Sequence, residues 1–214
     1  MIAIGSRFET ELGELLIKQF LGKGKSGYSY LSEVNNNFVI LKLMHDEKSP
    51  YYHFTSDKLS VEINAYNKLL ELGITVPKLF YYSLEKQFLI KEFIDGHTGA
   101  EIIAENKICE KIISQLFEMS DAAKRANLNI DFFPTNFILR KDKLYYIDYE
   151  INPYSEEWNL ENWGIYYWAN SKGFKEFLKT GDAVSINRNL EKGVPFKIPF
   201  QEQIKEWVEL YAKN

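Results

Sequence analysis

The chain has 214 residues, of which 45% are hydrophobic and 15% aromatic. This length and composition predict a globular protein with a substantial core, built as one domain or one two-lobed unit. The 26 lysines and arginines against 30 aspartates and glutamates give a net charge of −4. No broad basic surface follows from this balance, so we expect no direct binding of nucleic acid.

The sequence has no secretory leader pattern and no apolar run of about 18 residues, so we expect a cytoplasmic protein without a membrane contact. Cys109 is the only cysteine, which excludes an intrachain disulfide and suits a reducing compartment. Because it lies on an apolar helical stripe, we expect it to be a small core residue. The three histidines lack the spacing of a zinc site.

Three glycines near the N-terminus, Gly22, Gly24 and Gly27, have the spacing G-x-G-x-x-G. Dinucleotide-binding folds share this spacing, but there the glycines lead into a helix. Here residues 28–34, three asparagines and the apolar run 38–44 predict a strand, a turn and a second strand. We therefore expect a glycine hairpin, in which backbone N–H groups can close over phosphates.

A second phosphate-binding motif is excluded at the same place. Gly24, Lys25 and Ser26 imitate the end of a Walker A loop, which needs another glycine five positions before Gly24. That position is Gln19. The chain therefore has no nucleotide-triphosphatase P-loop of this kind.

Lys42 is a charged residue within the second apolar strand. It is either an edge-strand lysine that points to water or an ammonium that neutralises nucleotide phosphates and is held by a helical glutamate. Ser56 and Asp57 can cap a helix whose apolar stripe ends before Gly73. Glu62, on the inner edge of this helix, is the candidate partner of Lys42.

After this helix, residues 88–96 predict a strand that runs into a glycine turn, and residues 101–125 predict helices. We place the boundary between two lobes near Gly96. From Pro199 onward, apolar residues recur at helical spacing. We expect this tail to pack on the second lobe, and the alternative is a helix that docks a protein partner.

Three polar residues follow, Asp131, Asn136 and Asp148, with Asn136 five positions after Asp131. Residues 137–139 and 144–147 are apolar and flank a polar turn, which predicts a hairpin that delivers Asp148 at its end. Carboxylate and amide oxygens suit a hard cation such as Mg²⁺. By itself, an Asp and an Asn at this spacing are more often a loop cap than a site.

Taken in order, these features resemble the protein-kinase-like superfamily, over residues 15–164. The helix around Glu62 and its turn Gly73-Ile74-Thr75-Val76-Pro77-Lys78 are similar to small atypical kinases, such as the Rio-type enzymes and the compact kinase of the tRNA-threonylcarbamoylation complex. Asp148-Tyr149-Glu150 instead looks like the choline-kinase and aminoglycoside-kinase relatives.

The resemblance implies an α+β, two-lobed, protein-kinase-like fold. Residues 1–95 would form an N-lobe of antiparallel sheet plus one helix, and residues 96–214 a reduced, mainly helical C-lobe. In that family Asp131 would orient the acceptor hydroxyl and take its proton, while Asn136 and Asp148 would bind Mg²⁺ or Mn²⁺.

The resemblance also implies which residues bind ATP. Lys42, fixed by Glu62, would neutralise the phosphates, and the strand at residues 88–96 would be the hinge that binds the adenine edge through its backbone. The positions implied in nucleotide binding are Gly22, Gly24, Gly27, Lys42, Glu62, Glu92 and Ile94.

Several residues depart from the typical kinase pattern. Asn129-Ile130 replaces the usual His-Arg before the catalytic Asp, and Trp158 follows Asp148 too closely for a long activation segment. Phe133 stands where Ser/Thr protein kinases carry a lysine that steadies the transferred group, although Pro134 matches them.

Three functions therefore stay open. In the first two, the acceptor is a hydroxyl, on either a protein or a small molecule. An atypical protein Ser/Thr kinase is our first interpretation. A kinase for a sugar, amino alcohol or aminoglycoside is favoured by Phe133 and the Asp148-Tyr149-Glu150 triplet. A partner-dependent ATPase or pseudokinase scaffold is favoured by Asn129-Ile130 and the aromatic C-terminal helix.

Overall fold

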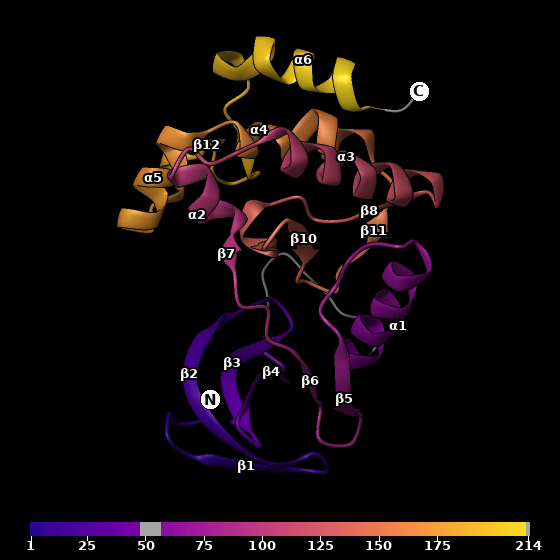
Figure 1. The fold of residues 1–214 in the computed structure, drawn as a ribbon, viewed down its shortest axis with the longest axis vertical. Helices are drawn as coiled ribbons and strands as arrows, with labels where there is room; N and C mark the ends of the chain where they lie inside the picture. Colours follow the sequence, from indigo (N-terminus) through magenta and orange to yellow (C-terminus); the bar gives the residue numbers. More distant parts are fainter. Residues whose placement is uncertain (48–56, 213–214) are drawn as a thin grey trace. The chain divides into compact units, whose positions relative to one another are not determined.

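The computed structural model describes residues 1–47 and 57–212. It divides into two compact units, an N-terminal unit of residues 1–66 and 77–94 and a C-terminal unit of residues 67–76 and 95–214. The first is a curled antiparallel sheet with one helix, and the second is rich in helices (Figure 1). This confirms the predicted α+β class and agrees with a two-lobed kinase-like fold.

The sheet of the N-terminal unit has six strands in the order β1-β2-β3-β4-β6-β5, and all of its neighbouring pairs are antiparallel. Its strands are β1 (Arg7–Thr10), β2 (Gly13–Lys23), β3 (Gly27–Val34), β4 (Asn37–Met44), β5 (Leu79–Ser83) and β6 (Phe88–Glu92).

Local turn chemistry sets the register of the central hairpin. Asn35 and Asn36 have φ angles of 49° and 61°, a conformation that asparagine tolerates better than most residues. The strands on either side pair from Val34 with Asn37 to Gly27 with Met44. This register buries one face of the sheet, whose core includes Leu15, Ile17, Tyr30, Leu41 and Ile90.

Helix α1 (Lys58–Glu71) begins at the predicted cap. Asp57 Oδ2 accepts a hydrogen bond of 2.9 Å from the Ser60 N–H, which satisfies one of the free donors of the first turn. Ser56, the other predicted capping residue, lies outside the described residues.

The C-terminal unit contains five α-helices among the residues described. They are α2 (Gly99–Ala104), α3 (Glu110–Arg125), α4 (Ile165–Trp168), α5 (Ser171–Thr180) and α6 (Gln201–Tyr211). A π-helical turn at Leu160–Gly164 precedes α4, and four 3₁₀ turns lie at Pro134–Asn136, Glu156–Trp158, Ala183–Ser185 and Ile198–Phe200.

Short strands complete this unit. The predicted hairpin before Asp148 is present as β9 and β10, and it is extended by β7 in a three-stranded sheet. The strands are β7 (His97–Thr98), β8 (Leu128–Asn129), β9 (Phe137–Arg140), β10 (Lys143–Tyr146), β11 (Asn152–Pro153), β12 (Asn187–Asn189) and β13 (Val194–Pro195).

One expectation about the core was wrong. Cys109 is exposed and stands at the N-cap of α3, ahead of the helix, rather than on its buried face. The apolar stripe of α3 begins only at Ile112. Among the described residues, the structure has no helix of the length and apolarity needed to cross a membrane.

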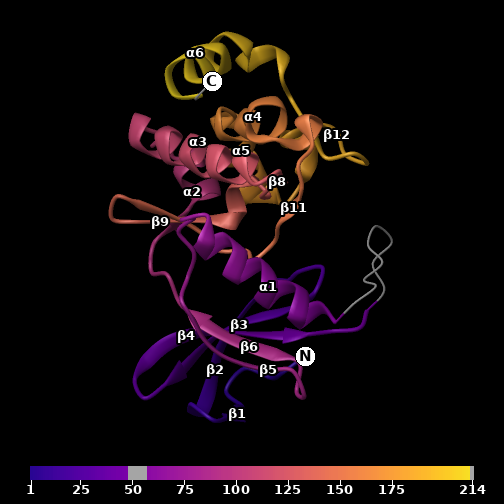
Figure 2. The same cartoon turned by 90° about the vertical axis from the view of Figure 1, so that its right-hand side faces the viewer.

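The C-terminal helix α6 packs on its own unit, as expected (Figure 2). Ile204 is 3% exposed, and the ring of Tyr211 lies 6.1 Å from the ring of Phe117 on α3. Leu210, in contrast, is 71% exposed. The helix therefore contributes Ile204 to the core and leaves its other face to solvent.

Replacing Ile204 by alanine should lower the free energy of unfolding by about 2–4 kcal/mol, because the change removes buried methyl groups and leaves a cavity. The matched control Leu210→Ala, on the exposed face of the same helix, should change it by less than about 0.5 kcal/mol. Urea unfolding followed by circular dichroism measures both. An unchanged midpoint for Ile204→Ala would mean that α6 is not part of the core in solution.

Candidate functional site

The N-terminal unit contains a buried ion pair between strand β4 and helix α1. The Lys42 Nζ lies 2.8 Å from Glu62 Oε1 and 2.7 Å from Oε2, and the two residues are 8% and 5% exposed. The structure thus places Lys42 in contact with the glutamate that the sequence suggested. A buried ammonium is costly unless its charge is compensated, and Glu62 provides that compensation.

A glycine lets the neighbouring strand approach Lys42. A Cβ atom on Gly27 would lie 2.5 Å from the Leu43 carbonyl oxygen and 3.2 Å from Lys42 Cγ. Any larger side chain at this position would push β3 away from β4. Gly27 is therefore required for the close pairing of the strand that carries Lys42.

The tip of the glycine hairpin is closed by hydrogen bonds. The Gly24 N–H donates to the Gly27 carbonyl at 2.9 Å, and the His45 N–H donates to the Ser26 carbonyl at 3.0 Å. A phosphate that used the Gly24 amide would have to compete with the first of these bonds. Gly22 lies in β2 just before the tip.

A surface cluster beside the hairpin neutralises one of its lysines. Lys23 forms an ion pair with Glu47, which also accepts a hydrogen bond from the Tyr28 hydroxyl. These two hydrogen bonds, from Lys23 first and then Tyr28, lower the pKa of Glu47 to about 2. Both lysines pair with a carboxylate, but the Lys23 pair is exposed to water whereas the Lys42 pair is buried, so Lys42 is the stronger candidate for binding a phosphate.

The two predicted hinge residues differ in their backbone hydrogen bonds. The Glu92 N–H donates to the Lys78 carbonyl at 2.8 Å, and Glu92 Oε2 accepts from the Lys78 N–H at 3.2 Å. Ile94 is 2% exposed, and its backbone N–H and C=O make no hydrogen bond to the residues that the structure describes. Buried backbone groups without a partner are rare, so Ile94 is the better candidate to bind a polar ligand edge.

In the C-terminal unit, Asp131 follows β8 in a tight local turn. Its Oδ1 accepts a hydrogen bond of 3.0 Å from the Phe133 N–H, two residues on. This Asx-type turn fixes the carboxylate of Asp131 before the 3₁₀ turn at Pro134–Asn136 begins. The Asn136 Nδ2 contacts the Asp131 carbonyl at 3.4 Å, which is long for a hydrogen bond.

The buried hydroxyl of Tyr146 connects Asp131 to the segment after the hairpin. It accepts a hydrogen bond from the Asp131 N–H at 3.3 Å and donates to the Glu150 carbonyl at 3.0 Å. Burial, and then the negative charges of Asp148, Asp131 and Glu150, raise the pKa of Tyr146 well above its ordinary value of 10.0. The hydroxyl therefore stays neutral under the negative charge of three carboxylates.

A backbone hydrogen bond joins the two segments that carry the candidate metal ligands Asn136 and Asp148. The Ile147 N–H donates to the Asn136 carbonyl at 2.8 Å, next to Asp148. Among the described residues, no group of three or more His, Cys, Asp and Glu side chains forms a metal site. Asn136 and Asp148 each carry an oxygen donor, the kind of ligand that Mg²⁺ prefers, and this ion usually binds one or two protein ligands together with substrate phosphates.

Two aromatic residues, Phe132 and Trp168, hold the loop around Asp131, and neither was predicted to belong to the site. The Trp168 Nε1–H donates to the Phe132 carbonyl at 2.9 Å. Phe132 stacks on Phe137, with ring centroids 6.1 Å apart, and Phe137 in turn contacts Tyr146. Their position in aromatic runs was the only signal in the sequence, and it indicated no more than a core.

Phe133 belongs to a different aromatic group. Its ring lies 5.1 Å from Tyr167 and 6.0 Å from Phe174 on α5. The side chain two residues after Asp131 is therefore part of an apolar cluster. It brings no positive charge to the carboxylate.

The segment from residue 149 to 159, which leads from Asp148 to the π-helical turn, is short and tied to β8. The Tyr154 N–H donates to the Asn127 carbonyl at 3.0 Å. The Asn129 Nδ2 donates to the Ser155 carbonyl at 2.9 Å. Asn129, which replaces the usual His, thus anchors this segment.

Comparison with known proteins agrees with these observations at a coarse level. No protein-family model matches the chain. Over 128 residues it is 24% identical to a protein named KEOPS complex subunit Bud32 from Pyrococcus abyssi (strain GE5 / Orsay), an alignment that covers 51% of this chain and 56% of that protein. The chain thus spans about half the length of the curated relative it matches. This weak homology supports the kinase-like superfamily and suggests kinase or ATPase activity at that level.

The buried ion pair should show strong energetic coupling. Lys42→Met or Glu62→Leu alone should destabilise the protein by about 3–5 kcal/mol, since each leaves an uncompensated buried charge. The double variant should recover much of this loss, and urea unfolding of all four proteins gives the coupling energy. The exposed pair Lys18–Glu33 is the control, with an expected coupling of about 0–1 kcal/mol. Equal couplings for the two pairs would show that Lys42 and Glu62 are hydrated in solution.

Tyr146 should make stability depend on pH in the alkaline range. Because its pKa is raised in the folded state, its contribution is fully present below the ordinary value of 10.0 and is lost as the pH rises above it. Urea unfolding between about pH 8 and pH 11 should therefore show a steeper alkaline loss for the wild type than for Tyr146→Phe. Tyr82→Phe, at a residue 42% exposed, serves as control and should keep the wild-type slope. Identical slopes for the wild type and Tyr146→Phe would contradict the burial of this hydroxyl.

Proposed function

We propose that the chain is an ATP- and divalent-metal-dependent phosphotransferase that moves the γ-phosphoryl group to a hydroxyl. The observation that carries this proposal is the buried pair of Lys42 and Glu62. Apolar side chains would serve a core equally well, so a buried ammonium beside a glycine hairpin points to an anionic ligand. Nucleotide phosphates are such a ligand, and the weak similarity to Bud32 favours the same class of chemistry.

In this proposal Lys42 neutralises the phosphates, and Glu62 fixes its position. The glycine hairpin with Gly22, Gly24 and Gly27 covers the phosphates through its backbone. The unpaired backbone groups of Ile94, rather than the engaged N–H of Glu92, bind the adenine edge. Each role needs only a positioned charge or dipole, and these are the main contributions of a protein to phosphoryl transfer.

Asp131 acts on the acceptor. The acceptor oxygen forms a bond to the γ-phosphorus, the bond between this phosphorus and the bridging oxygen breaks, and Asp131 takes the hydroxyl proton. Asn136 and Asp148 would hold the Mg²⁺ or Mn²⁺ ion, which neutralises negative charge on the phosphates when bound. The hydrogen bonds from the Phe133 N–H and of Tyr146 keep the Asp131 loop in one orientation before any substrate arrives.

The first candidate for the acceptor is a protein serine or threonine hydroxyl, as in an atypical protein Ser/Thr kinase. The turn at Gly73 and Pro134 favour it. A small-molecule kinase is the second, and a specific observation favours it. Phe133 packs against Tyr167 and Phe174. An apolar ring therefore stands at the position that carries a lysine in Ser/Thr protein kinases.

A protein partner is a further part of the proposal. The relative from Pyrococcus abyssi is named as a subunit of a complex, so this chain would also work with a protein partner. Because α6 exposes Leu210 while Ile204 is buried, this helix can contact a partner without leaving its own unit. The third function, a partner-dependent ATPase, differs in that water would accept the phosphoryl group.

Replacing Asp131 by asparagine should reduce phosphoryl transfer by about 10²–10⁴-fold, because the variant cannot take the proton. ATP binding should be nearly unchanged, since the asparagine Oδ1 can still accept the hydrogen bond of the Phe133 N–H. The assay uses γ-labelled ATP with Mg²⁺ or Mn²⁺ and a panel of proteins, sugars and amino alcohols, alongside equilibrium binding of ATP. Chelation of the metal should stop transfer in the wild type.

Asp142→Asn is the matched control. This residue lies in the β9–β10 turn, its side chain is 80% exposed, and its loss should leave the transfer rate unchanged. Label on protein supports the first acceptor class, label on a small alcohol the second, and release of phosphate without a labelled acceptor the ATPase. ATP binding without any transfer or hydrolysis, with or without the metal, would overturn the proposed enzyme.

A further inference from the structure

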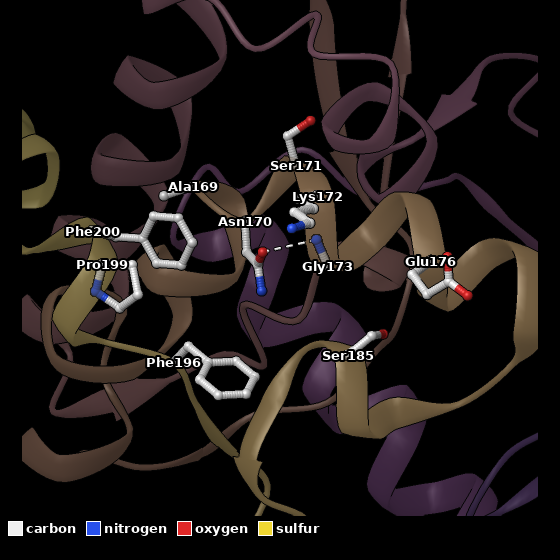
Figure 3. Close-up of a pocket in the computed structure, with 10 residues that line it drawn as sticks. All are labelled: Ala169, Asn170, Ser171, Lys172, Gly173, Glu176, Ser185, Phe196, Pro199 and Phe200. Carbon is white, nitrogen blue, oxygen red and sulfur yellow. Dashed lines mark hydrogen bonds between the residues drawn. The ribbon is translucent and has the colours of Figure 1, made fainter.

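A separate cavity of about 620 Å³ lies in the C-terminal unit, at the beginning of helix α5 (Figure 3). Phe196, Pro199 and Phe200 form its apolar wall, and Asn170 and Lys172 line the opposite part. This volume is within the range of about 300–1,000 Å³ typical of small-molecule sites. None of the residues assigned above to phosphoryl transfer lines the cavity, so the inference below goes beyond the proposed function.

A buried amide points into this cavity. Asn170 is 6% exposed and caps α5, and its Oδ1 accepts a hydrogen bond of 2.9 Å from the Gly173 N–H. This bond fixes which end of the amide faces inward, because only the oxygen can accept it. The Nδ2 group then points into the cavity (Figure 3) and has no hydrogen-bond partner among the residues that the structure describes. A donor so placed is available to an acceptor that enters the cavity from outside the chain.

Close packing holds the amide in place. A Cβ atom on Gly173 would lie 2.3 Å from Asn170 Nδ2 and 2.5 Å from the Ser185 carbonyl. Only glycine leaves space for the Asn170 side chain between α5 and the 3₁₀ turn that contains Ser185. The orientation of the donor is therefore built into the packing.

The charge at this end of the cavity favours an anion. The Ser171 and Gly173 N–H groups are engaged by the Ala169 carbonyl and by Asn170 Oδ1, but the dipole of α5 still attracts negative charge at this end, and Lys172 adds an ammonium at the rim. Glu176 also lines the cavity and opposes this charge. Lys172 lies beside Asn170, whereas Glu176 lies on the far side of the cavity, so the positive group is the nearer one to the amide (Figure 3).

We propose that this cavity binds a small apolar carboxylate, with its aromatic or aliphatic body against Phe196 and Phe200 and its carboxylate accepting from Asn170 Nδ2. The two halves of the cavity match the two halves of such a molecule. The carboxylate satisfies the amide donor and the positive helix end, and the apolar body covers the aromatic wall. The same chemistry is found in a free aromatic acid and in the C-terminal residue of a peptide.

Phenylacetate, its neutral analogue phenylacetamide and an acetylated peptide ending in phenylalanine are suitable probes. Each is titrated into the full chain and followed by ¹⁵N–¹H correlation spectra. We expect phenylacetate to shift the Asn170 side-chain NH₂ and the amides at the start of α5, and phenylacetamide to bind more weakly. Tighter binding of the peptide than of phenylacetate would identify a chain terminus as the source of the carboxylate, and the reverse a free acid.

Asn170→Asp is the decisive variant, because aspartate keeps the cap of α5 and the size of the side chain but replaces the donor by an anionic oxygen. It should weaken phenylacetate binding by about tenfold or more while the melting temperature stays the same or rises. Asn159→Asp is the matched control. Asn159 is also a buried N-cap, 4% exposed, but it does not line the cavity, so this variant should bind as the wild type does.

Two results would overturn the proposal. One is equal binding of phenylacetate and phenylacetamide by the wild type, and the other is undiminished binding by folded Asn170→Asp. If that variant does not fold, Phe200→Ala replaces it, since the loss of the aromatic wall should weaken phenylacetate binding as well. Wild-type binding by Phe200→Ala, or shifts that map away from α5, would equally refute the site.

Discussion

The buried contact between Lys42 and Glu62 is the constraint on which the N-terminal unit depends. Both groups lose their hydration, and their attraction offsets this loss only while they stay in contact. Strand β4 and helix α1 are therefore held in register, since a slip of either would leave a charge buried alone. Gly27 serves the same end, because it lets β3 lie close to the stem of Lys42. A cluster of apolar residues would not impose so strict a condition.

In the C-terminal unit, an uncharged side chain, Tyr146, connects segments that carry charged residues. The negative charges of Asp148, Asp131 and Glu150 all act on the buried Tyr146 hydroxyl and disfavour its ionisation. The Tyr146 hydroxyl acts as a dipole, with its oxygen on the Asp131 N–H and its hydrogen on the Glu150 carbonyl. Trp168 holds the same loop from the other side through Phe132. The backbone on either side of the hairpin is thus held by uncharged side chains.

Local signals in the sequence predicted more of the fold than of the site. The asparagine turn before β4, the Asp57 cap and the β9–β10 hairpin follow from neighbouring residues, and the structure contains all three. Cys109 was misjudged because helical spacing alone cannot show where the helix begins. The roles of Tyr146 and Trp168 were missed because they arise from contacts between distant segments. Lys42 and Glu62 could be paired from the sequence only by analogy with kinases, and their part in nucleotide binding stays a prediction.

The short segment between Asp148 and the π-helical turn has a consequence for control. Many signalling enzymes are switched by a loop that alternates between ordered and disordered forms, and a phosphate or ligand biases that equilibrium. Here Tyr154 is bound to Asn127 and Ser155 to Asn129 of β8, which disfavours such an alternation in residues 149–159. Control of such a chain would then come from the concentration of its substrates or from another molecule bound to its surface, and not from a rearrangement of this segment.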